Sequence, residues 1–173
     1  QFNRNFAGMN LEYVFQKDEK LTKLFNDYGD IKDITVPESY QKLWDEINLP
    51  IQLKKLDQNG INSNKKRNGI LEGLRKRAYY LTRIASVYGV KNIAEVGTAE
   101  GWQYFSFAQY CKEESKGRVF SCDPRDVRSD KHKEDYKLFT HFTNGTSKEM
   151  SNDINEAKID LFYIDGLHDK GTV

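Results

Sequence analysis

The sequence predicts an α/β fold, in which a parallel sheet of four strands alternates with helices and follows an N-terminal helical extension. Three observations support this prediction. Short apolar runs typical of buried strands alternate with stretches of helical periodicity in the second part of the chain. Residues 1–65 show helical patterns and turn signals instead. Glycines also stand where the first apolar run passes into a helix, which is typical of a βα turn.

Two helices are expected in the N-terminal extension. Apolar residues recur at near-helical spacing over residues 11–28, and Gly29 would end that helix. A second helix would begin at Pro37, because the missing N–H of proline is not needed in the first turn. We expect this helix to stop before Pro50.

A polar segment separates this extension from the rest of the chain. The Asn-Gly pair at 59–60 and the polar run over 62–68 are typical of a turn and a loop. We therefore divide the chain into residues 1–65 and residues 66–173. The helix expected over 69–88 would place its basic side chains Arg75, Lys76 and Arg83 mostly outside a shared face of Ile70, Leu74, Leu81, Ile84, Ala85 and Tyr88.

Strands and helices then alternate to the end of the chain. The strands are expected at 90–96, 119–122, 139–143 and 159–164, and the last of them is the most apolar. Helices are expected at 102–114, at 147–157 and between the second and third strands. This order indicates βαβ units and therefore a parallel sheet.

Composition excludes several classes of protein. No apolar run approaches the ~18 residues that a membrane span requires. The N-terminal residues do not resemble a signal peptide, so we expect a cytoplasmic protein. Cys111 and Cys122 match neither a disulfide framework nor a zinc pattern, and we expect buried, reduced thiols.

Positive charge is concentrated in one segment although the net charge of the chain is only +1. Residues 54–83 hold nine Lys or Arg against two carboxylates. Such a stripe usually marks a solvated helix face. The alternative is a docking surface for an anionic substrate or partner.

The first segment that indicates chemistry joins the first predicted strand to its helix. Glycine lets the backbone approach a ligand closely, and a helix N-terminus offers free N–H donors. A dinucleotide-binding turn has the pattern Gly-x-Gly-x-x-Gly, whereas here three residues separate Gly97 from Gly101 and Glu95 precedes both. An acid at this place suits a ligand with cationic ammonium and sulfonium groups better than a pyrophosphate. The alternative is a purely structural turn.

The second segment ends the next strand at Asp123, before Pro124. A carboxylate there can accept hydrogen bonds from both hydroxyls of a ribose. The alternative is a turn formed by the Asp-Pro pair.

The third segment follows the last predicted strand. That strand would deliver Asp165 and then His168 to the carboxyl edge of the sheet, where open α/β folds bind ligands. Asp165 can ligate a divalent metal or orient a substrate hydroxyl, and His168 has the intrinsic pKa of a general base. The alternative is a tight turn at Asp165-Gly166 with His168 on the surface.

Together the three segments resemble the class I S-adenosylmethionine-dependent methyltransferases, which have a Rossmann-like fold. The closest resemblance is to the branch with Asp-Gly-x-His after strand 4, which includes sugar and small-molecule O-methyltransferases and the related cephalosporin hydroxylase-like proteins. The resemblance covers about residues 70–173. It implies that the methionine end of the cofactor contacts Glu95, Gly97, Thr98, Ala99, Gly101 and Trp102. It implies a ribose contact at Asp123 and an adenine site near Thr146 and Ser147.

The sequence departs from the family pattern at three places. Ala99 stands where the loop often has a glycine, and Thr146 where an acid is common. The family's sheet has seven strands with strand 4 in its centre, whereas this sequence stops at Val173 shortly after that strand. An unpaired apolar edge favours aggregation, so we expect the sequence to be part of a longer protein. The sequence does not begin with Met, so we also expect that Gln1 is not the native start.

The resemblance implies transfer of a methyl group from S-adenosylmethionine, and we expect O-methylation of a small, anionic or sugar-containing acceptor. Asp165 would position the acceptor or a divalent metal, and His168 would accept the proton. Two alternatives are a non-catalytic binding or assembly module on the same scaffold and a metal-dependent hydroxylase of similar fold. We expect no membrane partner and no nucleic acid as the main ligand, while a homo-oligomer stays open.

Overall fold

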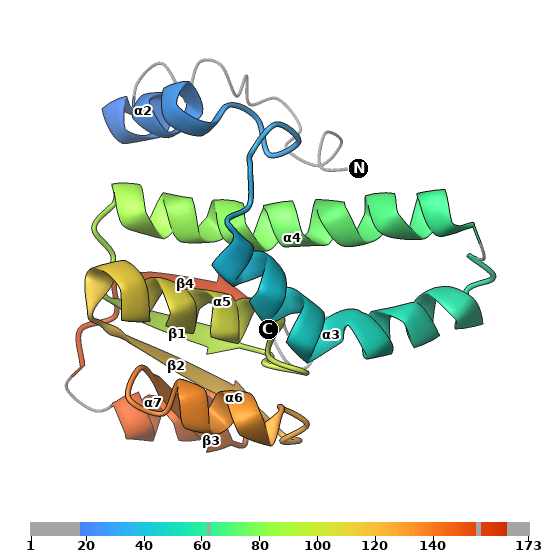
Figure 1. Ribbon diagram of the computed structural model, residues 1–173. Coiled ribbons are helices and arrows are strands. Elements are labelled where there is room, and N and C mark those ends of the chain that lie inside the picture. Colours follow the sequence, from blue (N-terminus) through green and yellow to red (C-terminus); the bar gives the residue numbers. More distant parts are fainter. Residues whose placement is uncertain (1–17, 62, 155–156, 166–173) are drawn as a thin grey trace, which may run out of the picture.

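The protein is built on a parallel four-stranded sheet (Figure 1). Its computed structural model describes residues 18–61, 63–154 and 157–165, with the backbone alone at 48–53 and 55. In spatial order the strands are β3 (Thr140–Asn144), β2 (Arg118–Asp123), β1 (Asn92–Val96) and β4 (Leu161–Ile164). The predicted Rossmann-like α/β fold is confirmed. Because the strands are parallel, their carboxyl ends lie at one edge of the sheet.

Helices cover both faces of this sheet. The helices after β1, β2 and β3 are α5 (Trp102–Tyr110), α6 (Asp130–Asp135) and α7 (Ser147–Ile154), and the π-helical turn η1 (Cys111–Ser115) continues α5. On one face Ile93 and Val119 pack against Phe105 and other buried residues of α5. On the other face Phe120 packs with Met150 of α7. The two central strands, β1 and β2, are therefore buried from both sides, as is usual in a parallel sheet.

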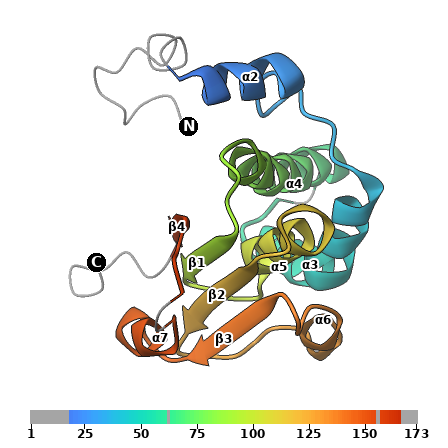
Figure 2. The same ribbon diagram turned by 90° about the vertical axis from the view of Figure 1, so that its left-hand side faces the viewer.

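Three helices precede the sheet in the chain: α2 (Glu19–Tyr28), α3 (Glu38–Gln58) and α4 (Asn64–Val87). The helices α3 and α4 both pack against α5, whereas α2 packs on the side of α4 that faces away from the sheet (Figure 2). Leu24 of α2 and Tyr79 of α4 belong to a second apolar cluster in that outer layer. The division at residue 66 stays a prediction.

The N-terminal helix differs in part from its prediction. Asp18 has an extended backbone, and its carboxylate accepts hydrogen bonds from the N–H groups of Lys20 and Leu21. It therefore acts as the N-cap, and α2 begins at Glu19. The rest of the predicted range, residues 11–17, lies outside the described residues. The predicted stop at Gly29 is confirmed, since this residue has a φ of 67°.

The prediction that the second helix stops before Pro50 is wrong. Helix α3 runs through Pro50 to Gln58 and changes direction about halfway along (Figure 1). A proline removes one hydrogen bond and bends a helix, but packing on both sides of it can keep the helix together. Ile47 before the proline and Leu56 after it are both buried. The turn expected at residues 59–60 is confirmed.

Two expectations for α4 are also wrong. The helix begins at Asn64, inside the segment expected to be a loop, because its lysines and arginines are good helix formers. Arg83 is buried instead of outside: its guanidinium pairs with Glu114 and lies 5.0 Å from the centre of the Tyr79 ring. Helix α4 is enclosed by two layers, so residues on more than one face are buried.

The remaining strands and thiols follow the sequence prediction closely. Both cysteines are buried and free, as predicted, and burial raises the pKa of each thiol to about 11. Within the described residues β4 pairs only with β1, and its Phe162 and Ile164 are exposed. No helix in the described part of the chain is long and apolar enough to cross a membrane.

Candidate functional site

The loop between β1 and α5 has an unusual backbone. Its φ angle is 95° at Gly97, 46° at Ala99 and 92° at Gly101. A Cβ atom at Gly101 would lie 2.7 Å from the Phe105 ring, so only glycine fits there. The N–H groups of Gly97 and Thr98 donate to the Cys122 carbonyl. These hydrogen bonds hold the loop against the end of β2. The loop then leads directly into the N-terminus of α5.

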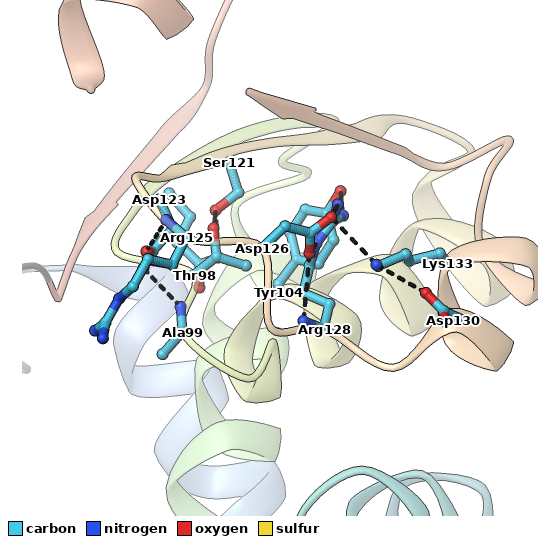
Figure 3. Close-up of polar contacts among 11 residues, drawn as sticks. Thr98, Ala99, Tyr104, Ser121, Asp123, Arg125, Asp126, Arg128, Asp130 and Lys133 are labelled. Carbon is cyan, nitrogen blue, oxygen red and sulfur yellow. Dashed lines mark hydrogen bonds and ion pairs between the residues drawn. The ribbon is translucent and has the colours of Figure 1, made fainter. Parts of the chain in front are cut away.

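A chain of hydrogen bonds connects Glu95 to this loop. The Ser121 hydroxyl lies 2.6 Å from a Glu95 carboxyl oxygen and 2.5 Å from the Thr98 hydroxyl (the Ser121–Thr98 pair is drawn in Figure 3). Glu95 and Ser121 are register partners on neighbouring strands, which explains their contact. When Glu95 is ionised, Ser121 must donate to it, and Thr98 then donates to Ser121.

Glu95 is almost completely buried, with 1% of its surface exposed. Burial raises the pKa of its carboxyl group to about 8, and the nearby Asp165 and Asp123 add to the rise against the opposing hydrogen bond from Ser121. Among the described residues Ser121 is its only hydrogen-bond donor. A buried carboxylate usually accepts several hydrogen bonds, so Glu95 keeps acceptor capacity for a bound donor.

Glu95 forms part of the wall of a cavity of about 200 Å³ at the carboxyl edge of the sheet. The β1–α5 loop contributes Gly97, Thr98, Ala99 and Glu100, and α5 contributes Trp102 and Gln103. Residues from three further elements complete the wall: Trp44 of α3, Leu74, Arg77 and Ala78 of α4, and Tyr163 and Asp165 at the end of β4. Five of the residues predicted for the methionine end of a cofactor therefore line one cavity, and Gly101 caps the adjoining helix.

Asp123 lies on the other side of the glycine loop. One of its carboxylate oxygens accepts a hydrogen bond from the Ala99 N–H and the other from the Arg125 N–H, both at 3.0 Å (Figure 3). Asp123 does not line the cavity. Its carboxylate is instead placed beside the loop at the end of β2, where each oxygen has further acceptor capacity.

The segment after β2 is fixed by a second polar cluster. The Arg128 guanidinium donates to both oxygens of Asp126 at 2.9 Å (Figure 3). It also lies 3.6 Å from the centre of the Phe142 ring. These hydrogen bonds hold the pKa of Asp126 at about 2, well below its usual value. Arg128 also donates to the Tyr104 hydroxyl. This cluster anchors the loop next to Asp123 to α5 and β3.

Thr146 lies in the turn after β3, and Ser147 is the first residue of α7. Both are exposed, and the Thr146 N–H and hydroxyl donate to the Glu149 carboxylate at 2.7 and 3.0 Å. The Gly145 N–H donates to the Asp123 carbonyl, which ties this turn to the end of β2. Thr146 and Ser147 do not line the cavity, and their role in adenine binding stays a prediction.

Asp165 follows β4 across the cavity from the glycine loop. It is exposed, and the Tyr163 hydroxyl lies 3.2 Å from its carboxylate. His168 lies outside the described residues, so its predicted role as a base stays a prediction. The described residues contain no group of three or more His, Cys, Asp or Glu that could hold a metal ion, and a metal at Asp165 also stays a prediction.

The sequence analysis missed two kinds of site residue. Ser121 stands two residues before Asp123 on the same strand, so the alternation of side chains would have placed both on one face. Leu74, Arg77 and Ala78 have the i, i+3, i+4 spacing of one helix face, but only the tertiary structure brings that face to the cavity. No pattern in the sequence connects Trp44 to this site.

Comparison with known proteins supports the same interpretation. Residues 94–173 match the model of a family described as a methyltransferase domain. A comparison with curated protein sequences finds no significant match. The matched segment contains Glu95, the glycine loop, Asp123 and β4, and it supports a class I methyltransferase-like domain.

Proposed function

We propose that this protein binds S-adenosylmethionine in the cavity beside the glycine loop and transfers its methyl group to a small molecule. The buried Glu95 carboxylate in the cavity wall, with a single hydrogen-bond donor among the described residues, carries the proposal. Such a group is costly to bury unless a ligand cation or donor completes its hydrogen bonds.

The charges and the small residues in the cavity wall support the binding of this cofactor. S-adenosylmethionine has an ammonium and a sulfonium group, and Glu95, Glu100 and Asp165 provide carboxylates in the cavity wall. Gly97 has no side chain and Ala99 only a methyl group, so the backbone can approach a ligand closely. Trp44 and Trp102 provide apolar surface in the wall of the same cavity, as is usual in ligand sites.

We assign a role to each residue from its position. When bound, the cofactor supplies an electrophilic methyl group. Glu95 would bind its ammonium group, and Asp123, beside the loop, would accept hydrogen bonds from the ribose hydroxyls. The protein then acts mainly by holding the acceptor and the methyl group in line.

Binding of S-adenosylhomocysteine to the Asp123→Ala variant tests the cofactor site. We expect its dissociation constant to rise about tenfold or more, because the variant loses two hydrogen bonds to a charged acceptor. Isothermal titration calorimetry measures the constant. Asp130→Ala is the matched control, since Asp130 is exposed at the start of α6 and does not line the cavity. Unchanged affinity in Asp123→Ala would remove the ribose assignment.

We further propose an oxygen of a small, anionic or sugar-containing molecule as the acceptor. Asp165 in the cavity wall would orient the acceptor hydroxyl, and His168, three residues later, would take its proton. His168→Ala should lower methyl transfer at least a hundredfold while leaving S-adenosylhomocysteine affinity unchanged. Turnover assays with hydroxyl-containing acceptors measure this effect, and full activity of the variant would remove His168 as the base.

A further inference from the structure

Helix α4 carries five basic residues that are at least partly buried. Four of them form ion pairs with carboxylates of the chain: Arg67 with Asp57, Arg75 with Asp45, Lys76 with Glu72, and Arg83 with Glu114. Arg77 is the fifth. It forms neither an ion pair nor a hydrogen bond with any residue that the structure describes.

Arg77 is also the only one of these five that lines the cavity beside the glycine loop. The other ionisable groups in that wall include the carboxylates of Glu95, Glu100 and Asp165. A guanidinium has five N–H donors in a planar fork and matches a carboxylate with two parallel hydrogen bonds. The cavity therefore combines acceptors for a cation with one cationic donor group for an anion.

We propose that Arg77 binds the α-carboxylate of the methionine end of the cofactor, while Glu95 binds its ammonium group. This inference rests on the proposed function and extends it to one residue and one ligand group. A zwitterionic amino-acid end matches a wall that offers a carboxylate from β1 and a guanidinium from α4. Helix α4, which precedes the sheet, would then supply part of the cofactor site.

If Arg77 binds the carboxylate, the protein should prefer ligands that carry this group. S-adenosylmethionine and its decarboxylated form carry the same adenosine, sulfonium and ammonium groups and differ only in the carboxylate. The wild-type protein should bind S-adenosylmethionine on the order of 10- to 100-fold more tightly than the decarboxylated form, as expected for hydrogen bonds between charged groups. Calorimetry on the full chain with both compounds measures this ratio.

Removal of the guanidinium should abolish that preference. In Arg77→Gln we expect S-adenosylmethionine affinity to fall to near that for the decarboxylated compound, whose own affinity stays unchanged. Arg77→Lys should keep part of the preference, because lysine keeps the charge but not the fork. Arg75→Gln is the matched control on the same helix, since Arg75 lines a different cavity and pairs with Asp45, and it should keep the wild-type ratio.

Each outcome decides the matter. A wild-type protein that binds both compounds equally overturns the role of Arg77 and leaves the cofactor site standing. If Arg77→Gln lowers the affinity for both compounds equally, the role of Arg77 is also overturned, because that result indicates a structural effect. Binding of neither compound by the wild-type protein removes the proposed function and this inference together. The wild-type ratio needs no variant, so the proposal can fail even if Arg77→Gln does not fold.

Discussion

At the scale of single residues, Glu95 is the group whose chemistry depends most on the fold. A buried glutamate near the end of a strand is costly, and here it has 1% exposure and a single hydrogen-bond donor among the described residues. Its pKa of about 8 means that the folded protein without ligand holds a proton there at neutral pH. A cationic ligand that binds the carboxylate would therefore displace this proton.

The raised pKa of Glu95 should make stability depend on pH. Glu95 ordinarily titrates near 4.5, as in the unfolded chain, and near 8 in the folded protein, so the folded state binds the extra proton between these values. The free energy of unfolding should therefore fall as the pH rises from about 4.5 to about 8, by at most about 1.4 kcal/mol per pH unit. Urea unfolding without ligand at several pH values measures this slope.

Glu95→Gln should remove this contribution, because an amide cannot ionise. The difference in unfolding free energy between the variant and the wild type should grow with pH up to about 8. Glu134→Gln, which changes an exposed glutamate in the same way, is the control. A parallel curve for Glu95→Gln would contradict the assignment of the shifted pKa.

At the scale of elements, the β1–α5 loop depends on three residues with positive φ. Two of these are glycines and the third is Ala99, which adopts a left-handed conformation that costs an L-residue about 1–2 kcal/mol. The loop is held in place by hydrogen bonds from its backbone to Cys122 and Asp123 of β2. It is therefore a preformed surface rather than a flexible connection.

Replacing glycine by alanine and alanine by glycine in this loop should change the free energy of unfolding in opposite directions. Gly101→Ala should lower the free energy of unfolding by about 2 kcal/mol and weaken S-adenosylhomocysteine binding, since the new Cβ meets the Phe105 ring at 2.7 Å. Ala99→Gly should leave stability unchanged or raise it by up to about 1 kcal/mol, because glycine relieves the strained backbone. Urea unfolding and calorimetry measure both effects. A large stability loss in Ala99→Gly would show that the methyl group has a packing role.

At the scale of the whole molecule, the helices that precede the sheet form part of the candidate site. Trp44 of α3 lines the cavity and donates a hydrogen bond to Ser106 of α5. The centres of the Trp44 and Trp102 rings are 5.4 Å apart. Arg77 and its neighbours on α4 line the same cavity. The helical layer therefore contributes to the wall around the glycine loop as well as to the core.

Two substitutions on α3 should separate the roles of this layer. Trp44→Leu and Tyr40→Leu each remove a buried aromatic ring, and we expect each to lower the free energy of unfolding by about 1–3 kcal/mol. Only Trp44 lines the cavity, so only its variant should bind S-adenosylhomocysteine several-fold more weakly. Thermal unfolding and calorimetry provide the two measurements. Equal affinity of the two variants would remove Trp44 from the site.

The parts of the fold and site that depend on local pattern were predictable. The alternation of apolar runs and helical periodicity predicted the order of strands and helices, because each element must bury its own face. Glu95, Gly97 and Asp123 could be predicted as candidate site residues because they stand at strand ends and in a βα turn, where parallel sheets bind ligands. The unusual φ values at Gly97 and Gly101 agree with the residue type found there.

Only the tertiary structure decided which residues from distant elements meet. The burial of Arg83, the continuation of α3 through Pro50 and the position of Arg77 in the cavity all depend on packing between helices far apart in the sequence. A single helix pattern cannot tell which of its faces meets a neighbour when layers lie on two sides, as they do around α4. The sequence by itself therefore determined the order of the strands along the chain. It also determined the position of the glycine loop between Glu95 and Asp123. The fold decided the environment that raises the pKa of Glu95 and the helix that brings a cation to its cavity.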